Sequence, residues 1–183
     1  MKMTKNVLVL HCSPREDGNT HSLAEMFSAG AEASSHRVTR LNIGKAIVGP
    51  CAACNYCREH DHICIQQDDM PQILGAIVAA DVVAFAAPLY FYGLPAQMKL
   101  VMDRLYALGP QYPRHNKEIV LLLAGGSPKP EDYEGAIKNF QLAFIDYLKW
   151  TDRGVLIAPG VYAAGEIKEN PILADAFKIG FNL

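Results

Sequence analysis

The sequence predicts an α/β fold built on a doubly wound parallel sheet, and three features support this prediction. Short apolar segments alternate with longer segments that have helical periodicity. The apolar segments are nearly continuous, as in strands that are buried on both faces of a sheet. Several of them end directly in a turn signal, such as Pro88 or the pair Gly125 and Gly126. A chain of 183 residues, 50% of them hydrophobic, fits a single domain, which we expect to span residues 1–183.

The first half of the chain contributes three strands and two helices to this prediction. Residues 5–10 form an apolar run that predicts a buried strand, and residues 20–33 have the periodicity of a helix. Residues 36–43 alternate like a second strand. Residues 70–80 predict a helix, and residues 82–87 form a continuous apolar strand.

The second half continues the same alternation. A helix over 95–108 opens on a proline, which suits the first turn of a helix, and residues 118–124 predict another buried strand. A long amphipathic pattern predicts a helix over 131–150. Residues 154–158 predict the fifth strand, and residues 170–181 predict a closing helix.

Alternating strands and helices form a parallel sheet with right-handed crossovers and helices on both faces. The order 2-1-3-4-5 is one of the two common forms of such a sheet. We therefore expect a flavodoxin-like, doubly wound, five-stranded parallel sheet in that order. Residues 44–69 have no clear periodicity, and a loop of that length is usually functional or disordered. We interpret it as a cysteine-rich loop insertion.

Charge and apolar patterning exclude several classes of partner. The net charge is −2 and no long Lys/Arg cluster occurs, so nucleic acid and membrane are not expected as partners. Small molecules are the expected targets. The first apolar run is too short for a signal peptide, and the longest apolar stretch, 74–89, is interrupted by Asp81. These features predict a cytoplasmic protein.

The loop after the first strand has the composition of a phosphate site. In a doubly wound sheet this loop leads into a helix N-terminus, whose free N–H groups and dipole attract an anion. Hydroxyl, amide and guanidinium groups gather there with a glycine that permits close approach. The alternative is that they only cap the helix or face solvent. A single glycine and the lack of a Walker lysine favour a mononucleotide over NAD or ATP. The predicted residues are Ser13, Arg15, Gly18, Asn19 and Thr20.

The loop after the third strand is expected to bind the ring system of the same ligand. In the order 2-1-3-4-5 the first and third loops meet at the switch point of the sheet. Three consecutive aromatic residues there offer flat apolar surface and hydroxyl groups to a ring such as isoalloxazine, unless they pack into a core or a subunit contact. The predicted residues are Pro88, Leu89, Tyr90, Phe91, Tyr92 and Gly93. Gly125 and Gly126, after the fourth strand, are expected to offer backbone N–H groups to the polar rim of the ring.

Four of the five cysteines lie close together in a chain for which we expect a reducing compartment, so metal or redox chemistry is favoured over structural disulfides. The compact spacing suits a [4Fe-4S] cluster better than the separated pairs of a zinc ribbon. Zinc bound with His60 or His62 and four reduced thiols are the alternatives. The predicted metal ligands are Cys51, Cys54, Cys57 and Cys64.

Taken in order, these motifs resemble the NADPH-dependent FMN reductase family of flavodoxin-fold proteins, and within it the iron-sulfur flavoprotein branch. The matching elements are Ser-Pro-Arg-x-x-Gly-Asn-Thr at 13–20, Cys-x-x-Cys-x-x-Cys with Cys64 beyond, Asp68-Asp69-Met70, Ala80-Asp81, Pro88-Leu89-Tyr90, and Lys99 with Asp103-Arg104. They span residues 7–126. The resemblance implies FMN bound without covalent attachment, reduction by NADH or NADPH, and a homodimer or homotetramer in which a neighbouring subunit helps to cover the flavin.

The resemblance also assigns roles to residues. It implies that Ser13, Arg15, Asn19 and Thr20 hold the phosphate and that residues 88–93 hold the ring. Members of the iron-sulfur branch ligate a cluster with this cysteine arrangement, whereas many similar relatives carry FMN alone. We interpret Lys99, Asp103 and Arg104 as a charged helix face with an i,i+4 pair, or as an interface, rather than as catalytic residues.

The function expected from these observations is an FMN-dependent NAD(P)H oxidoreductase. Hydride passes from NAD(P)H to FMN, and electrons then pass to a quinone, a nitro compound, a flavin or an iron-sulfur cluster. Because the cofactor carries the chemistry, no catalytic side chain is expected. One alternative is an electron carrier that exchanges electrons with a ferredoxin-like partner, and another is a redox or metal sensor. Residues 109–116, rich in Pro, Tyr and His, are expected to line a substrate entrance or an interface.

Overall fold

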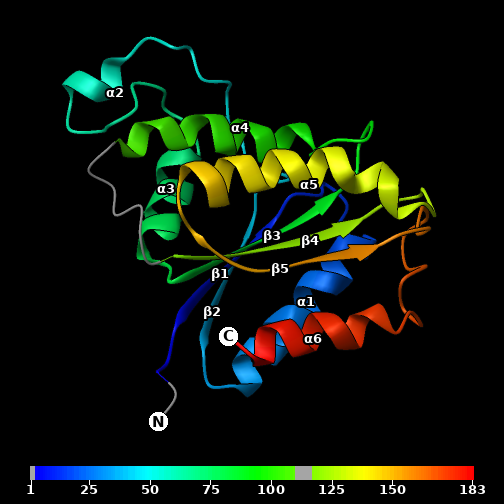
Figure 1. Ribbon diagram of the computed structural model, residues 1–183. Coiled ribbons are helices and arrows are strands. Elements are labelled where there is room, and N and C mark those ends of the chain that lie inside the picture. The colour runs from blue at the N-terminus through cyan, green and yellow to red at the C-terminus, as the bar shows by residue number, and fades with distance from the viewer. Residues whose placement is uncertain (1–2, 110–116) are drawn as a thin grey trace.

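The computed structural model of the chain, which describes residues 3–109 and 117–183, contains a five-stranded parallel sheet (Figure 1). Its order is β2-β1-β3-β4-β5, so the predicted flavodoxin-like topology is confirmed. The continuous apolar runs form the three central strands, whose side chains are buried almost throughout. The strands are β1 (Asn6–His11), β2 (Arg37–Asn42), β3 (Val82–Pro88), β4 (Glu118–Ala124) and β5 (Thr151–Ala158).

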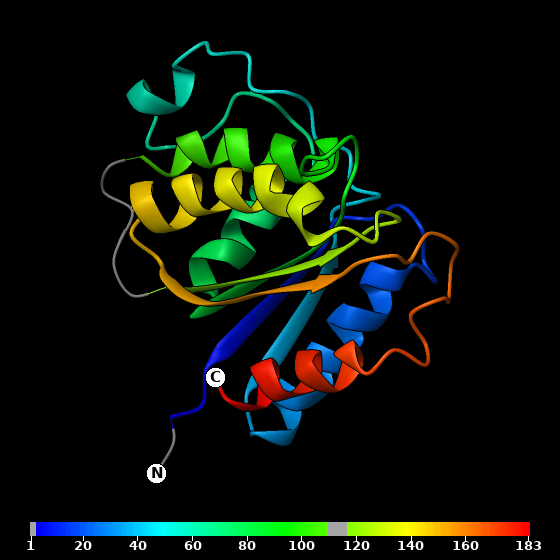
Figure 2. The same cartoon turned by 45° about the vertical axis from the view of Figure 1, so that its right-hand side comes forward.

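Helices cover both faces of the sheet, as predicted, and each face has its own apolar core (Figure 2). Because successive side chains of a strand point to opposite faces, Leu8 and Leu10 enter one core whereas Val7 and Val9 enter the other. The first core lies under α3 (Met70–Ala79), α4 (Ala96–Arg104) and α5 (Glu134–Phe140), and the second lies under α1 (Asn19–Ala33) and α6 (Ile172–Phe181).

The predicted helix over 131–150 is divided in the structure. A 3₁₀ turn, η2 (Pro130–Tyr133), leads into α5, and the chain then continues as a π-helical segment, η3 (Gln141–Tyr147). The amphipathic spacing that predicted one helix does not distinguish these pitches. A second 3₁₀ turn, η1 (Leu105–Leu108), ends the predicted helix 95–108 in the same way.

Strand β5 begins three residues earlier than the predicted boundary at Gly154. Its first residues, Thr151 to Arg153, are exposed at the sheet edge and therefore carry no apolar signal. The register against β4 shifts between Ile119 and Leu121, and Gly154 has a φ of +129°, a value that L side chains rarely adopt. A glycine at this irregularity lets the edge strand continue through it.

The cysteine segment, residues 44–69, contains one short helix, α2 (Tyr56–Glu59), and otherwise irregular backbone. Figure 1 shows α2 beyond the C-terminal end of α4, whereas the strand arrows end on the opposite side of the molecule. Residues 110–116, for which a substrate entrance or an interface is predicted, lie outside the described ranges. Within the described ranges, no helix is long and apolar enough to cross a bilayer.

Helices α1 and α6 pack closely because each contributes a glycine at the crossing. A Cβ atom on Gly30 would lie 2.0 Å from the carbonyl oxygen of Phe177, and one on Gly180 would lie 2.0 Å from that of Phe27. We expect Gly30→Ala to lower the free energy of unfolding by about 2 kcal/mol, because overpacking of up to ~3 kcal/mol is offset by ~1 kcal/mol of helix propensity. Urea denaturation followed by circular dichroism measures this change.

Gly75→Ala is the matched control for that substitution. Gly75 lies in α3, and a Cβ there would meet no atom within 4 Å. The substitution should therefore raise stability by about 0.5–1 kcal/mol through helix propensity alone. If Gly30→Ala behaved like Gly75→Ala, the close crossing of α1 and α6 would be wrong.

Candidate functional site

A hollow of about 340 Å³ opens at the carboxyl ends of β1, β3 and β4, where a doubly wound sheet binds its ligands. It is lined by all five residues predicted for the phosphate site and by parts of the loops after β3 and β4. The predicted residues that line it are Ser13, Arg15, Gly18, Asn19, Thr20, Pro88, Leu89, Tyr90, Gly125 and Gly126. Three loops that are far apart in sequence therefore form one concave surface.

The β1–α1 loop, residues 12–18, places polar groups at the start of α1. Ser13 and Thr20 are almost fully buried, and the Ser13 Oγ accepts a hydrogen bond of 3.2 Å from the backbone N–H of Arg15. The first N–H groups of a helix have no partner within the helix, and they carry the positive end of its dipole. This end of the hollow is thus suited to an anion.

Gly44 packs directly against the backbone of the β1–α1 loop. Its N–H donates a hydrogen bond of 2.9 Å to the carbonyl oxygen of His11. A Cβ at position 44 would lie 2.2 Å from the carbonyl oxygen of Ser13 and 2.8 Å from the nitrogen of Pro14. The loop can occupy its position because residue 44 has no side chain.

The side chain of Asn19 is engaged within the protein. Its Nδ2 donates a hydrogen bond of 2.9 Å to the carbonyl oxygen of Ala163, and its Oδ1 accepts one of 3.2 Å from the N–H of Ile167. The Nη1 of Arg15 donates a 3.2 Å hydrogen bond to the carbonyl oxygen of Tyr162. In this structure Asn19 positions the β5–α6 loop, residues 159–171, beside the hollow.

Four residues that line the hollow are not among the predicted ones: Ala124, Ser127, Val161 and Tyr162. Val161 and Tyr162 belong to the β5–α6 loop, which starts at the same edge of the sheet as the other three loops. The sheet order alone places this loop near the site. No motif in residues 159–171 marks it.

The β3–α4 loop, residues 89–95, divides the predicted ring-binding residues into two groups. Leu89 and Tyr90 line the hollow together with Pro88. Tyr90 and Gly93 exchange two backbone hydrogen bonds, of 3.1 and 3.0 Å, and this turn directs Phe91 and Tyr92 away from the hollow. Phe91 is fully exposed and Tyr92 is 65% exposed. Phe91, Tyr92 and Gly93 therefore lie outside the hollow of a single chain.

The turn that carries Phe91 and Tyr92 is conformationally unusual. Their φ values are +46° and +60°, and bulky side chains rarely adopt left-handed backbone. Such strain is typical of segments held for a function. Two strained, exposed aromatic residues beside the hollow fit a contact with a ligand or with another subunit.

Tyr133 fixes the wall formed by Gly125 and Gly126. Its buried hydroxyl donates a hydrogen bond of 2.9 Å to the carbonyl oxygen of Ser127, and burial raises the pKa of Tyr133, so this donor stays protonated. A Cβ on Gly125 would lie 2.8 Å from the Tyr133 hydroxyl, and one on Gly126 would lie 2.9 Å from the Tyr162 ring. Both glycines are needed for these contacts.

The four predicted metal ligands line a second, smaller hollow in the cysteine segment. Cys51 and Cys54 are exposed, Cys64 is half-buried and Cys57 is buried. No three of their sulfur atoms lie within 4.8 Å of one another. A single zinc ion binds thiolates at about 2.3 Å and needs its sulfurs closer together than about 4.6 Å.

A [4Fe-4S] cluster binds each thiolate through a different iron, so it suits this wider spacing better than zinc does. The hollow is small, at about 30 Å³. The donor set fits a cluster.

Arg104 anchors the cysteine segment to α4, and its expected place on an exposed charged helix face is wrong. Its side chain is 2% exposed. It forms an ion pair with the Asp68 carboxylate, and its Nη2 donates a 3.2 Å hydrogen bond to the sulfur of Cys64. Lys99 and Asp103 do form the predicted exposed i,i+4 pair, at 2.5 Å.

The charge of Asp68 is stabilised by the same contacts. Burial alone would raise its pKa, but hydrogen bonds from Arg104 and from the N–H groups of Gly49 and Met70 hold the pKa of Asp68 below its usual value. These bonds join both ends of the cysteine segment to α4. Sequence patterns gave no sign of them, because the partners come from an aperiodic segment.

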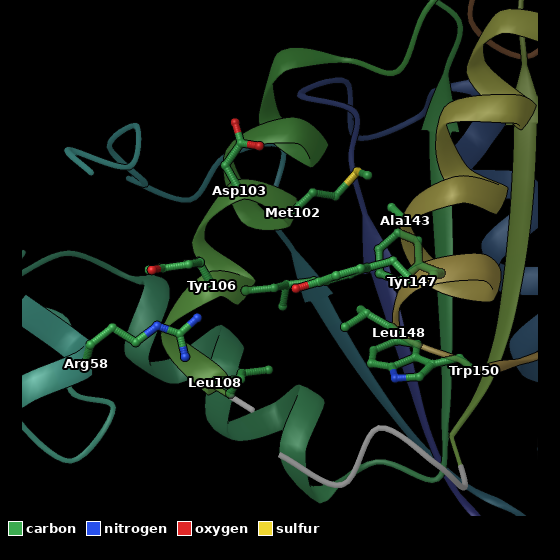
Figure 3. A pocket seen from close by; sticks show the side chains of 12 residues that line it. Arg58, Met102, Asp103, Tyr106, Leu108, Ala143, Tyr147, Leu148 and Trp150 are labelled. Carbon is green, nitrogen blue, oxygen red and sulfur yellow. The ribbon is translucent and has the colours of Figure 1, made fainter. Parts of the chain in front are cut away.

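A third hollow, of about 250 Å³, lies between η1 at the end of α4 and the π-helical segment η3 (Figure 3). Most of its lining residues are apolar or aromatic, and the charged residues Arg58 and Asp103 also line it. Tyr106 also lines the cysteine hollow. The Nε1 of Trp150, the single tryptophan of the chain, is buried and has no hydrogen-bond partner in the described residues. This hollow shares no lining residue with the one at the strand ends.

Comparison with known proteins identifies the family of the chain. The family model for NADPH-dependent FMN reductases matches residues 5–131, more than half of the sequence. The iron-sulfur flavoprotein of Methanosarcina thermophila is 34% identical over 116 residues, which cover 63% of this chain and 60% of that protein. An iron-sulfur flavoprotein of Archaeoglobus fulgidus is 28% identical over 124 residues, covering 67% of this chain and 56% of that protein. The chain thus spans less than two thirds of these relatives.

Solved structures support the fold. An NAD(P)H:quinone oxidoreductase from Methanothermobacter marburgensis superimposes with a TM-score of 0.76 at 19% identity, covering 98% of this chain and 96% of that one. An azoreductase from Bacillus anthracis superimposes with a TM-score of 0.75 at 21% identity, covering 99% of this chain and 100% of that one. With the family match over residues 5–131, this chain belongs to the NADPH-dependent FMN reductase family.

Proposed function

We propose that this chain is an FMN-dependent NAD(P)H oxidoreductase that passes electrons to a small acceptor such as a quinone, a nitro compound or a flavin. The observation that carries the proposal is the hollow at the strand ends. It joins an anion-binding helix N-terminus to a flat wall formed by Leu89 and Tyr90. The family match and the names of the structural neighbours, a quinone oxidoreductase and azoreductases, support the same chemistry.

The residues of the hollow suit FMN in size and chemistry. The buried hydroxyls of Ser13 and Thr20 and the guanidinium of Arg15 would hold the phosphate at the start of α1. Leu89 and Tyr90 would contact the ring system, and the backbone around Gly125 and Gly126 would face its polar rim. FMN, when bound, supplies the hydride acceptor and the electron donor. The protein would position the ring where a nicotinamide can reach it.

A homodimer or homotetramer would complete the site. Phe91 and Tyr92 stand exposed beside the hollow on a strained turn. Burial of a side chain such as Phe91 is worth about 1.5–3 kcal/mol. We propose that these two rings contact a neighbouring subunit that covers the flavin.

The second candidate function is an iron-sulfur flavoprotein electron carrier that exchanges electrons with a ferredoxin-like partner. Four cysteines line one hollow, and the guanidinium of Arg104 donates to the sulfur of Cys64. A cationic donor stabilises a thiolate and would stabilise an anionic cluster bound to it. In an electron carrier of this kind, NAD(P)H does not reduce the flavin directly.

Anaerobic reduction of the FMN-loaded protein distinguishes the two functions. We expect NADH or NADPH to bleach the flavin absorption completely, because the open hollow admits a nicotinamide beside the ring. Iron and acid-labile sulfide are assayed on the same protein, and about four of each per chain would place a cluster on the cysteines. Reduction by a reduced ferredoxin but by neither pyridine nucleotide would replace the oxidoreductase with the carrier.

A further inference from the structure

Two histidines and a glutamate converge beside the β1–α1 loop, and none of the three lines the hollow at the strand ends. His11 ends β1, whereas His21 and Glu25 lie one turn apart on α1. Each offers one ligand atom, and the three atoms all lie within 4.8 Å of one another. The Nε2 of His11 is 3.9 Å from the Oε1 of Glu25, and the two imidazole rings are 5.0 Å apart between centroids.

The His11 side chain is nearly buried in this cluster. It is 10% exposed, its Nε2 points toward the carboxylate of Glu25, and its ring packs beside that of His21. An imidazole nitrogen is a common metal ligand, so an ion bound between the three side chains has this one within reach.

Arg40 is the competing partner for Glu25. Its Nε lies 3.3 Å from the Oε1 of Glu25, and its Nη2 lies 3.0 Å from the Oε1 of Glu32. Because Glu32 also holds the guanidinium, Arg40 keeps an anionic partner when Glu25 turns toward another cation. The guanidinium charge should nevertheless weaken the binding of any cation at this site.

We propose that His11, His21 and Glu25 bind one divalent transition-metal ion of the class that includes zinc, nickel and cobalt. Imidazole nitrogen and carboxylate oxygen are the ligands that these ions take from proteins, with water in the remaining positions. The ion would join the end of β1 to the start of α1. It would therefore hold both ends of the loop that carries Ser13, at a place separate from the four cysteines.

Cobalt titration of the full-length protein, followed by absorption and calorimetry, tests the site. Thiolate ligands give Co²⁺ intense near-ultraviolet charge-transfer bands, whereas nitrogen and oxygen ligands give only weak visible bands. Binding to the cysteines and binding to the proposed site are thus separable. We expect one Co²⁺ per chain without thiolate bands, accompanied by a rise in Tm, since an ion that binds only the folded state stabilises it.

Three variants decide the outcome. We expect His21→Ala, which removes a partly exposed ligand, to weaken this binding more than tenfold, and Arg40→Gln to tighten it about tenfold by removing the competing charge. His60→Ala is the matched control, because His60 is exposed in the cysteine segment and contacts Tyr56 instead. Thiolate-free Co²⁺ binding that survives in His21→Ala, or that Arg40→Gln leaves unchanged, overturns the proposal.

Discussion

Replacing Arg104 with methionine is expected to lower the free energy of unfolding by about 3–5 kcal/mol, because it leaves a nearly buried carboxylate without its cation. The Asp68 side chain is 9% exposed, and Arg104 is its cationic partner in the ion pair. The substitution also removes the hydrogen bonds to the Cys64 sulfur and to the carbonyl oxygen of Gly49. Urea denaturation measures the loss.

Lys99→Met is the matched control for Arg104→Met. Lys99 lies on the same helix and pairs with Asp103, but both side chains are about half exposed, at 48% and 46%. An exposed i,i+4 pair contributes about 0.3–0.5 kcal/mol, so this variant should remain close to the parent protein. Equal stability losses in the two variants would show that Arg104 does not act through its buried contacts.

A double variant separates charge from packing. Asp68→Asn removes the uncompensated charge and keeps one oxygen, which can accept from one of the two backbone N–H groups, of Gly49 and Met70, that donate to different oxygens of Asp68. We therefore expect Asp68→Asn with Arg104→Met to be more stable than Arg104→Met alone. A double variant that is no more stable would assign the loss to packing of the arginine stem.

The parts of the fold that follow from the sequence are those with a local physical signal. Val82 to Pro88 and Glu118 to Ala124 are continuous apolar runs, and strands buried on both faces require them. The β1–α1 loop also has a local signal, because polar residues and a glycine lie between a predicted strand and a predicted helix. The order of the sheet then brings this loop to the one that follows β3.

The parts that do not follow depend on partners distant in sequence. Arg104 has the pattern of a solvated helix residue, and its burial depends on Asp68, which lies in a segment without periodicity. Tyr162 reaches the hollow because Asn19 holds the β5–α6 loop through Ala163 and Ile167. The turn that directs Phe91 out of the hollow depends on left-handed backbone, which aromatic residues do not predict.

Replacing Gly44 with alanine is expected to weaken FMN binding about 100-fold, or about 2.7 kcal/mol, while the sheet remains folded. The new Cβ would lie 2.2 Å from the carbonyl oxygen of Ser13 and 2.3 Å from its carbonyl carbon. These are backbone atoms that no side-chain rotation can move, so the β1–α1 loop must shift by about 1 Å, a displacement that can cost about 100-fold in a site that depends on geometry. Flavin fluorescence on titration of the apoprotein measures the affinity.

Gly49→Ala, in the same segment, is the matched control for Gly44→Ala. A Cβ on Gly49 would approach only side-chain atoms, the nearest being the terminal oxygen of Gln66 at 2.8 Å, and that flexible side chain can move away. Its affinity for FMN should match that of the parent protein. Because Gly44 belongs to no predicted binding motif, a loss confined to Gly44→Ala would arise from displacement of the β1–α1 loop. Unchanged affinity in a folded Gly44→Ala protein would instead move the phosphate site away from Ser13.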